Sequence, residues 1–212
     1  MFELIPFLLE RLGIMIILAF ILAQWGPTRR LLKQPEAGWQ FGLLILIFAT
    51  YGILSNYTGV KVDLAKFLPH TWLEQVDGTS AIANTRTMIV VISGLLAGPI
   101  GGTITGLLVG IHRYTLGGFT AFACALSTVV AGGVSGLLRP YWRDRLGSQA
   151  LLPICLTGFL MVFEMSLILL FSDPFPAALE LIQFIFLPMT VVNVLGVWLF
   201  LSIIRLAARE EE

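Results

Sequence analysis

The sequence predicts an all-α integral membrane protein, a bundle of about six spans that includes a glycine-rich, broken pair of short helices. Hydrophobic residues make up 57% of the 212 positions and charged residues only 12%, and the mean hydropathy is +0.90. A soluble domain carries about 25% charged residues. This chain therefore has too few charges to cover a water-facing surface, and we expect it in the lipid bilayer as a multi-pass protein.

Charge and cysteine usage exclude several classes of function. The formal net charge is zero, so we expect no nucleic-acid partner bound through a basic face. Cys124 and Cys155 lie in apolar runs without a CxxC pattern or a nearby histidine pair. No metal, cofactor or disulfide framework is therefore expected. Glu3 stands where a signal peptide would be basic, which indicates a retained first span.

Five apolar runs are long enough to be spans of the ordinary kind. They cover residues 12–25 (extended outward by 2–9), 39–54, 120–138, 151–171 and 177–204. The polar stretch 55–80 carries interspersed apolar residues, and it predicts a short element lying at the membrane interface.

Residues 83–114 are apolar but are broken by Gly98-Pro99, and the basic residues decide how they cross. Lys and Arg of short loops collect on the cytoplasmic side. A single crossing would put the basic clusters on opposite sides, whereas a turn at Gly98-Pro99 keeps them all in the cytoplasm. We therefore predict a helical hairpin of two halves of about 14–15 residues with both ends outside, packed inside the bundle. The clusters are Arg29, Arg30 and Lys33; Arg139, Arg143 and Arg145; and Arg205 and Arg209.

Glycines recur every four residues in this hairpin and in the following span. Such small-xxx-small spacing lets helix backbones approach closely in lipid. Close packing is the favoured interpretation, and a glycine-lined ligand path is the alternative. The positions are Gly102, Gly106 and Gly110, then Gly132 and Gly136.

The hairpin would bring Arg86, at its start, and Arg113, at its end, to the extracytoplasmic face. Two guanidinium groups repel each other unless an anion lies between them, and a carboxylate fits their fork. The alternative is that each arginine snorkels to lipid headgroups. Asn84 or Thr85 is placed to cap the helix that begins at Arg86, and a helix N-terminus also attracts anions.

Polar residues of two later spans complete the candidate site. Cys124 and Ser127 share a helix face, so both could contact a ligand. For each residue taken singly, a structural role is favoured. Cys124 would be a small buried thiol, and the hydroxyls of Ser127 and Thr128 would bond to their own helix. Glu164 lies within a span, where a carboxylate costs about 2.5–3.5 kcal/mol, so it is functional or has a structural partner such as Asn193.

Several stretches together resemble the LytS-type membrane sensor, the five-transmembrane receptor module, over about residues 35–206. They are Ile82 to Arg86, Gly98-Pro99 with the glycine repeat, His112-Arg-Tyr-Thr-Leu-Gly-Gly118, Thr120 to Cys124, Ser127-Thr128, Phe163-Glu164-Met165 and 188–196. The resemblance implies a bacterial inner-membrane module that passes a signal to a cytoplasmic histidine kinase or diguanylate cyclase in cis. Pyruvate-like carboxylates and cell-wall regulation are associated with the family. It implies ligand roles for Arg86, Arg113, Cys124 and Ser127; Asn84, Thr128, Glu164 and Asn193 complete our candidate set.

The expected organisation has three parts: a leading helix and basic loop (1–34), the sensor domain (35–206) and a cytoplasmic stub (207–212). The sequence contains no kinase phospho-acceptor box, ATP-binding box or GGDEF signature. We therefore expect a non-catalytic sensor that binds a small carboxylate from outside and works as a homodimer. The alternative is the substrate-binding membrane subunit of a transporter.

Overall fold

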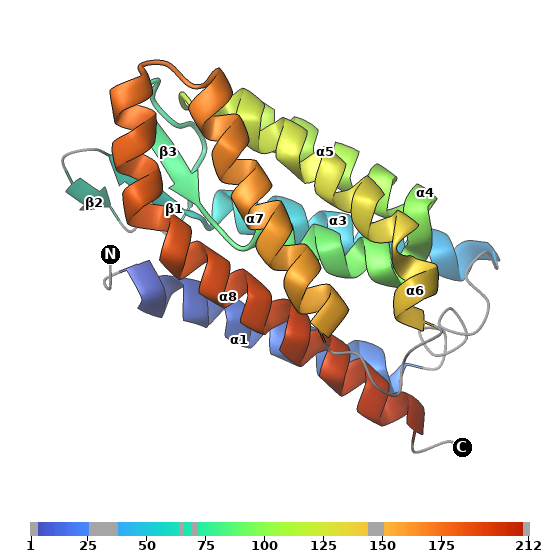
Figure 1. Cartoon of the computed structure of the whole chain (residues 1–212). Helices are drawn as coiled ribbons and strands as arrows, with labels where there is room; N and C mark the ends of the chain where they lie inside the picture. The colour runs from blue at the N-terminus through green and yellow to red at the C-terminus, as the bar shows by residue number, and fades with distance from the viewer. Residues whose placement is uncertain (1–3, 26–37, 64–65, 69–71, 144–150, 210–212) are drawn as a thin grey trace.

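The computed structural model describes residues 4–25, 38–63, 66–68, 72–143 and 151–209. Within them the chain is a bundle of helices with one small sheet (Figure 1), which confirms the predicted fold class. Among the described residues five helices have the length and apolarity of a membrane span, although α4 reaches that length only across its break at Gly98, and α5 is a shorter apolar helix. The helices are α1 (Leu4–Gln24), α3 (Gly38–Tyr57), α4 (Arg86–Thr115), α5 (Ala121–Leu137), α6 (Arg139–Arg143), α7 (Leu151–Phe171) and α8 (Phe175–Arg209).

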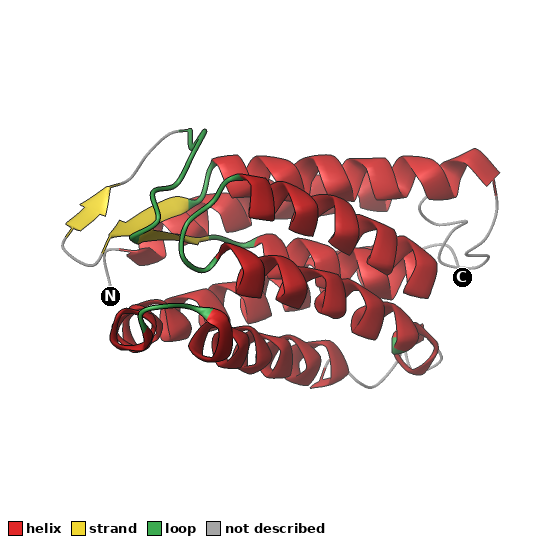
Figure 2. Ribbon diagram, turned by 90° about the horizontal axis from the view of Figure 1, so that it is seen from above, coloured by secondary structure: helices red, strands yellow, loops and turns green. Residues whose placement is uncertain are grey.

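The helices lie side by side, so the bundle has two opposite ends (Figures 1 and 2). One end, here called the sheet end, carries the strands and the start of α1. The other, here called the basic end, carries α6 and the end of α8. There the Arg205 guanidinium lies 5.3 Å from the centre of the Trp142 ring, and the Arg139 side chain lies beside Gly98. The positive-inside rule assigns the basic end to the cytoplasm. The loop with Arg29, Arg30 and Lys33, and also Arg145, lie outside the described residues.

The predicted helical hairpin is confirmed. In a straight helix Ser93 and Thr105 would lie about 18 Å apart, since each residue advances about 1.5 Å. Their hydroxyls instead form a hydrogen bond of 2.8 Å. The chain reverses at Gly98, whose φ of 79° is open to glycine and strained for other residues. Pro99 then begins the return. The inbound half, 86–97, is shorter than the outbound half, 99–115, whereas nearly equal halves were expected.

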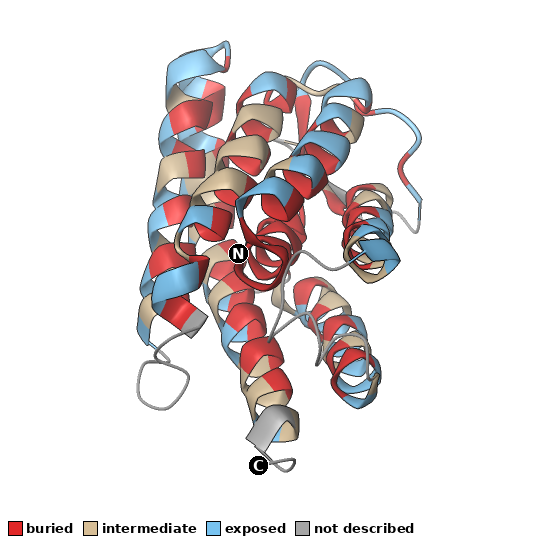
Figure 3. Cartoon of the chain, turned by 90° about the vertical axis from the view of Figure 1, so that its right-hand side faces the viewer, coloured by how far each residue is buried: buried red, intermediate tan, exposed pale blue. Residues whose placement is uncertain are grey.

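The inbound half of α4 forms the centre of the bundle. Its residues 86–97 are all buried, so this half is packed inside the bundle as predicted. The outbound half exposes Ile100 and Ile111, so the prediction that both halves are internal is wrong for it. The surrounding helices turn buried residues inward and exposed ones outward (Figure 3). Their exposed faces carry large apolar side chains such as Ile17, Ile100 and Leu170, which suit a lipid environment.

The glycine repeat serves close packing between α4 and α5. A Cβ added at Gly106 would lie 2.9 Å from the carbonyl oxygen of Thr128 and 3.1 Å from the Cα of Val129. Backbone atoms also face Gly102 and Gly132. Because facing backbone fills these positions, the structure supports close helix packing over a glycine-lined ligand path.

Replacing Gly106 with alanine should lower the free energy of unfolding by about 1–3 kcal/mol, because the added methyl forces α5 away. Gly158→Ala is the matched control: this helical glycine of α7 has open space around it, so alanine should be neutral or stabilise by about 0.5–1 kcal/mol. Thermal melting of both variants in one detergent measures the difference. Equal melting temperatures would contradict close packing at Gly106.

Residues 55–80 take a form other than the single interface element that the sequence indicated. They form two strands of a three-stranded antiparallel sheet ordered β2-β1-β3, with Val62 opposite Ala81. The alternating burial of Val60 and Val62 fits a strand with one face covered. Asn84 and Thr85 then lead from β3 directly into α4, which fixes where Arg86 begins. The strands are β1 (Val60–Asp63), β2 (Lys66–Leu68) and β3 (Ser80–Ala83).

The loop before β3 closes over the end of the hairpin. Val76 forms a parallel bridge with Gly117, and the Val76 amide donates to the carbonyl oxygen of Leu116 at 2.8 Å. Lys61 forms an ion pair with Asp77, and its hydrogen bond and charge hold the pKa of Asp77 below the ordinary value. Asp77 is exposed, so solvent screens this pair and it adds little stability.

Candidate ligand site

The hairpin brings its two terminal arginines together at the sheet end. Arg86 is the first residue of α4, and Arg113 lies in the last turn of the same element. Both side chains are 0% exposed, and their positive charges interact with each other. The interpretation that they snorkel to headgroups is therefore wrong. Their convergence follows from the reversal at Gly98, because a straight α4 would hold them at opposite ends.

Arg86 is bound on all three of its nitrogens. Nη2 forms an ion pair with the Glu164 carboxylate of α7, Nε donates to the Thr128 hydroxyl of α5 at 2.8 Å, and Nη1 donates to Asn84 Oδ1 at 3.1 Å. The Thr87 hydroxyl donates to the other oxygen of Glu164 at 2.9 Å. One buried guanidinium thus joins α4, α5 and α7, and Glu164 has its counter-charge inside the bundle.

Asn193 was one possible structural partner for Glu164, as an alternative to a functional role. The structure gives Glu164 the partners Arg86 and Thr87 instead. Asn193 Oδ1 accepts a hydrogen bond from the Met88 amide at 2.8 Å, and its Nδ2 donates to the Met189 carbonyl at 2.8 Å. Asn193 therefore ties α8 to the first turn of α4, where backbone amides lack helical partners. Thr85 is the N-cap residue but its side chain does not cap the helix; Asn84 Oδ1 accepts from the Arg86 amide at 3.4 Å.

Arg113 differs from Arg86 because its hydrogen-bond partners are neutral. Nη1 donates to the Gly117 carbonyl at 2.6 Å and Nη2 donates to the Thr120 hydroxyl at 3.2 Å. Within the described part of the chain, its buried Nε has no hydrogen-bond partner. Among the described residues Arg113 forms no ion pair, although it also feels the charge of Glu164. A buried guanidinium without its own counter-ion is costly, so an anionic partner would stabilise this group.

The α5 candidates occupy three different positions. The Cys124 side chain is buried and lies close enough to Arg86 and Arg113 to interact with both guanidinium groups electrostatically. The Thr128 hydroxyl donates to the Cys124 carbonyl at 2.6 Å and accepts from Arg86. The Ser127 hydroxyl donates to the Cys124 carbonyl at 2.9 Å, which is the bond to its own helix that the sequence favoured. Cys124 and Thr128 therefore belong to the cluster, whereas the Ser127 hydroxyl is bonded to its own helix.

Sequence reasoning missed a polar chain that leads from Arg86 toward the sheet. Asn84 Nδ2 donates to Asn56 Oδ1 at 3.0 Å, and Asn56 Nδ2 lies 3.3 Å from His112 Nδ1. The His112 ring packs against Tyr57 with centres 4.5 Å apart, and Tyr57 stacks on Trp72 at 4.6 Å. Asn56 is a lone amide at the end of an apolar run; because a buried amide requires partners, it could have been singled out.

The site thus combines two buried guanidinium groups with one buried carboxylate. With all three ionised, Arg86, Arg113 and Glu164 leave one net positive charge inside the bundle. A monovalent anion placed against Arg113 would neutralise it and supply acceptors for the Arg113 nitrogens. The arrangement suits anion binding within the bundle, close to the sheet end.

The fold and this buried polar cluster define a multi-pass membrane protein built around an internal helical hairpin. The family described as 5TMR of 5TMR-LYT matches residues 28–207. The chain belongs to this family of five-transmembrane modules, which confirms the resemblance seen in the sequence.

Curated relatives match over the whole of this chain. The Sensor protein LytS of Bacillus subtilis (strain 168) is 39% identical over 213 residues, that of Bacillus cereus is 37% identical over 215, and that of Enterococcus faecalis (strain ATCC 700802 / V583) is 33% identical over 217. Each match covers 100% of this chain but 36% of the relative, so this chain corresponds to about a third of those proteins. No solved structure matches it.

Proposed function

We propose that this chain is a sensor module that binds a small, pyruvate-like carboxylate from the extracytoplasmic side and signals to a cytoplasmic effector domain. The observation that carries the proposal is the fully buried guanidinium of Arg113. Among the described residues it bonds only neutral groups, and its Nε has no hydrogen-bond partner. A carboxylate offers paired oxygen acceptors and the missing negative charge.

The two arginines have different tasks in this proposal. Because Arg86 is already paired with the Glu164 carboxylate, Arg113 provides the direct contacts to the ligand carboxylate. Arg86 adds positive charge nearby, and Glu164 holds it in place. Cys124 interacts with both guanidinium groups, so its thiol is placed to contact the other end of a short ligand.

Binding has a direct route to the loop that covers the sheet end. Since both guanidinium groups are inaccessible, a ligand reaches Arg113 only when the cover moves. Arg113 donates to the Gly117 carbonyl, and Gly117 forms the bridge with Val76. A carboxylate that competes for the Arg113 donors would weaken the hold on Gly117, so occupancy would alter the contact between the hairpin and the covering loop.

The path to the cytoplasm runs through α8. Asn193 of α8 bonds the first turn of α4, and α8 continues as a helix past Pro188 to Arg209 at the basic end. A helix that spans the whole bundle can carry a shift or rotation to a domain beyond it. The relatives named Sensor protein LytS are longer than this chain, which supports an effector in cis, a histidine kinase or a diguanylate cyclase. The expected homodimer stays a prediction.

Calorimetric titration of the detergent-purified chain tests the proposed ligand class. We expect saturable binding of pyruvate or a similar short monocarboxylate at one site per chain. Pyruvamide, which has the same shape but no negative charge, should not bind, because it leaves the charge of Arg113 uncompensated. Equal binding of the amide, or no binding by any member of a panel of short carboxylates, would overturn the proposal.

A further inference from the structure

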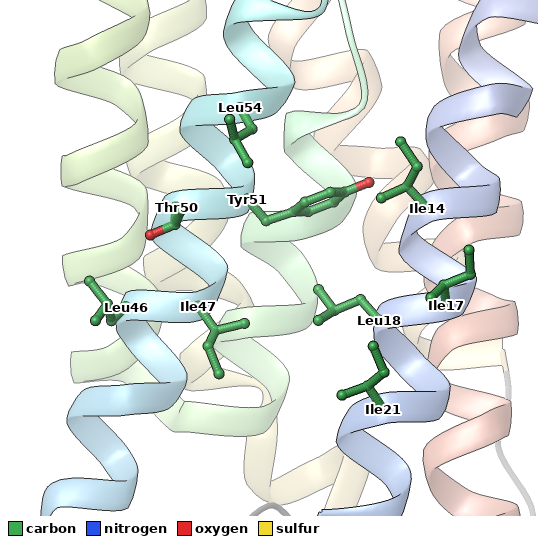
Figure 4. A pocket seen from close by; sticks show the side chains of 9 residues that line it. All are labelled: Ile14, Ile17, Leu18, Ile21, Leu46, Ile47, Thr50, Tyr51 and Leu54. Atoms are coloured by element: carbon green, nitrogen blue, oxygen red, sulfur yellow. The ribbon is translucent and has the colours of Figure 1, made fainter.

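A second feature lies away from the arginine cluster, on the flank of the bundle between α1 and α3. It is an apolar groove with a volume of about 460 Å³, within the roughly 300–1,000 Å³ of small-molecule sites (Figure 4). Both flanking helices are long and apolar enough to span the membrane, so the groove opens toward acyl chains. Its lining includes Ile14, Ile17 and Ile21 of α1 and Leu46, Thr50 and Leu54 of α3.

One end of this groove is closed by a polar bridge. The Tyr51 hydroxyl, which points toward α1 in Figure 4, donates to the Arg11 carbonyl at 3.0 Å. Arg11 Nε in turn donates to the carbonyl of Thr58, just beyond α3, at 3.2 Å. In the described part of the chain, the two Nη groups of Arg11 form no hydrogen bond and no ion pair. The groove therefore has a cation with free donors at its sheet end.

We propose that the groove binds one anionic phospholipid, with the phosphate on Arg11 and an acyl chain along α1 and α3. Guanidinium groups bind phosphate through paired hydrogen bonds, which accounts for the free Nη donors. From Ile14 to Ile21 the groove follows α1 for about 10 Å, a length that part of an acyl chain fills. By the positive-inside rule, Arg11 lies at the extracytoplasmic leaflet.

The free charge also distinguishes a lipid from a helix of a second copy. An apolar helix in the groove would cover its walls but would leave the Arg11 donors facing a lipid-like surface without partners, which is costly. An anionic phospholipid satisfies both parts of the site, because its phosphate binds Arg11 and its acyl chain covers the apolar walls. The site is independent of the proposed carboxylate ligand, because none of its lining residues belongs to the arginine cluster.

Native mass spectrometry of the detergent-purified full chain tests the site directly. The chain is incubated with phosphatidylglycerol or with phosphatidylcholine of the same acyl composition, and bound lipid is counted. We expect one retained phosphatidylglycerol and about tenfold weaker retention of phosphatidylcholine. The choline cation of phosphatidylcholine offsets the charge of its phosphate and so weakens the contact with Arg11. Equal retention of both lipids would show an unspecific lipid shell and overturn the proposal.

Three variants separate the headgroup from the chain. Arg11→Gln should reduce phosphatidylglycerol retention to the level of phosphatidylcholine, and Arg11→Lys should restore part of it. Thr50→Trp should fill the groove and remove both lipids, whereas Ile104→Trp, on the exposed surface of α4, should behave as the unchanged chain. If Thr50→Trp does not fold, Arg11→Gln decides by itself. Unchanged lipid preference in Arg11→Gln, or a dimer in place of bound lipid, would contradict the proposal.

Discussion

Replacing Glu164 with alanine should lower the free energy of unfolding by about 3–5 kcal/mol, because it leaves the Arg86 charge buried without its partner. Arg86 is 0% exposed, and Glu164 supplies its only ion pair among the described residues. Thr87 also loses the acceptor of its hydroxyl. The measurement is the shift in thermal or denaturant unfolding of the purified chain in a fixed detergent.

Two controls show whether the loss comes from the uncompensated charge. The double variant Arg86→Met with Glu164→Leu removes both charges and should recover much of the stability, because apolar residues replace buried pairs well. Asp77→Asn breaks the exposed pair with Lys61 and should leave stability unchanged. If Glu164→Ala unfolds like the unchanged chain, the pair does not hold the bundle together. If the double variant is the least stable of all, the loss does not come from an uncompensated charge.

The hairpin could be predicted because local and long-range signals agree in the sequence. Gly98-Pro99 breaks the helix at a point where an ordinary span would continue. The basic residues around Arg139 and Arg205 then require that the chain return to the side on which it entered. Each of these signals can be read without knowing which helices touch. For that reason the meeting of Arg86 and Arg113 could also be foreseen.

The partner of Glu164 could not be found in the same way. Arg86 and Glu164 are 78 residues apart, and their contact depends on the depth and rotation of α7 against α4. Apolar runs fix neither quantity, because several faces of α7 are apolar enough to turn inward. Asn193 was an equally reasonable partner on the sequence alone. In the structure the position of α8 gives it a backbone amide of α4 instead.

The sheet was missed for a different reason. Alternating Val60 and Val62 do carry the two-residue period of a strand, but a strand of four residues is too short to be distinguished from a loop by pattern. Its stability comes from pairing with β3, some twenty residues later, and from covering the hairpin. Such pairing is non-local, and single-sequence patterns do not contain it.

The Arg113→Gln variant is the sharper test of the ligand site. Among the described residues Arg113 has no charged hydrogen-bond partner that its removal would leave buried and unpaired. Removing Arg86 would leave Glu164 buried alone, so a lost affinity could reflect a damaged fold. Arg113→Gln leaves only the Gly117 carbonyl and the Thr120 hydroxyl to be satisfied, and glutamine can donate to either. We expect it to melt near the unchanged chain and to bind the carboxylate with about thirtyfold lower affinity or worse, equivalent to about 2–5 kcal/mol.

Graded substitutions around Arg113 should reproduce the chemistry of a guanidinium fork. Arg113→Lys keeps the charge but loses the paired donors, so it should bind nearly as poorly as Arg113→Gln. Cys124→Ala should cost about 1 kcal/mol, the value of one neutral hydrogen bond. Ser127→Ala is the matched control, since its hydroxyl is bonded to its own helix, and it should bind as the unchanged chain does. A melting curve first shows that each variant folds. Calorimetric titration with pyruvate then gives the affinity of each variant. If Arg113→Gln folds and binds with unchanged affinity, the carboxylate does not contact Arg113.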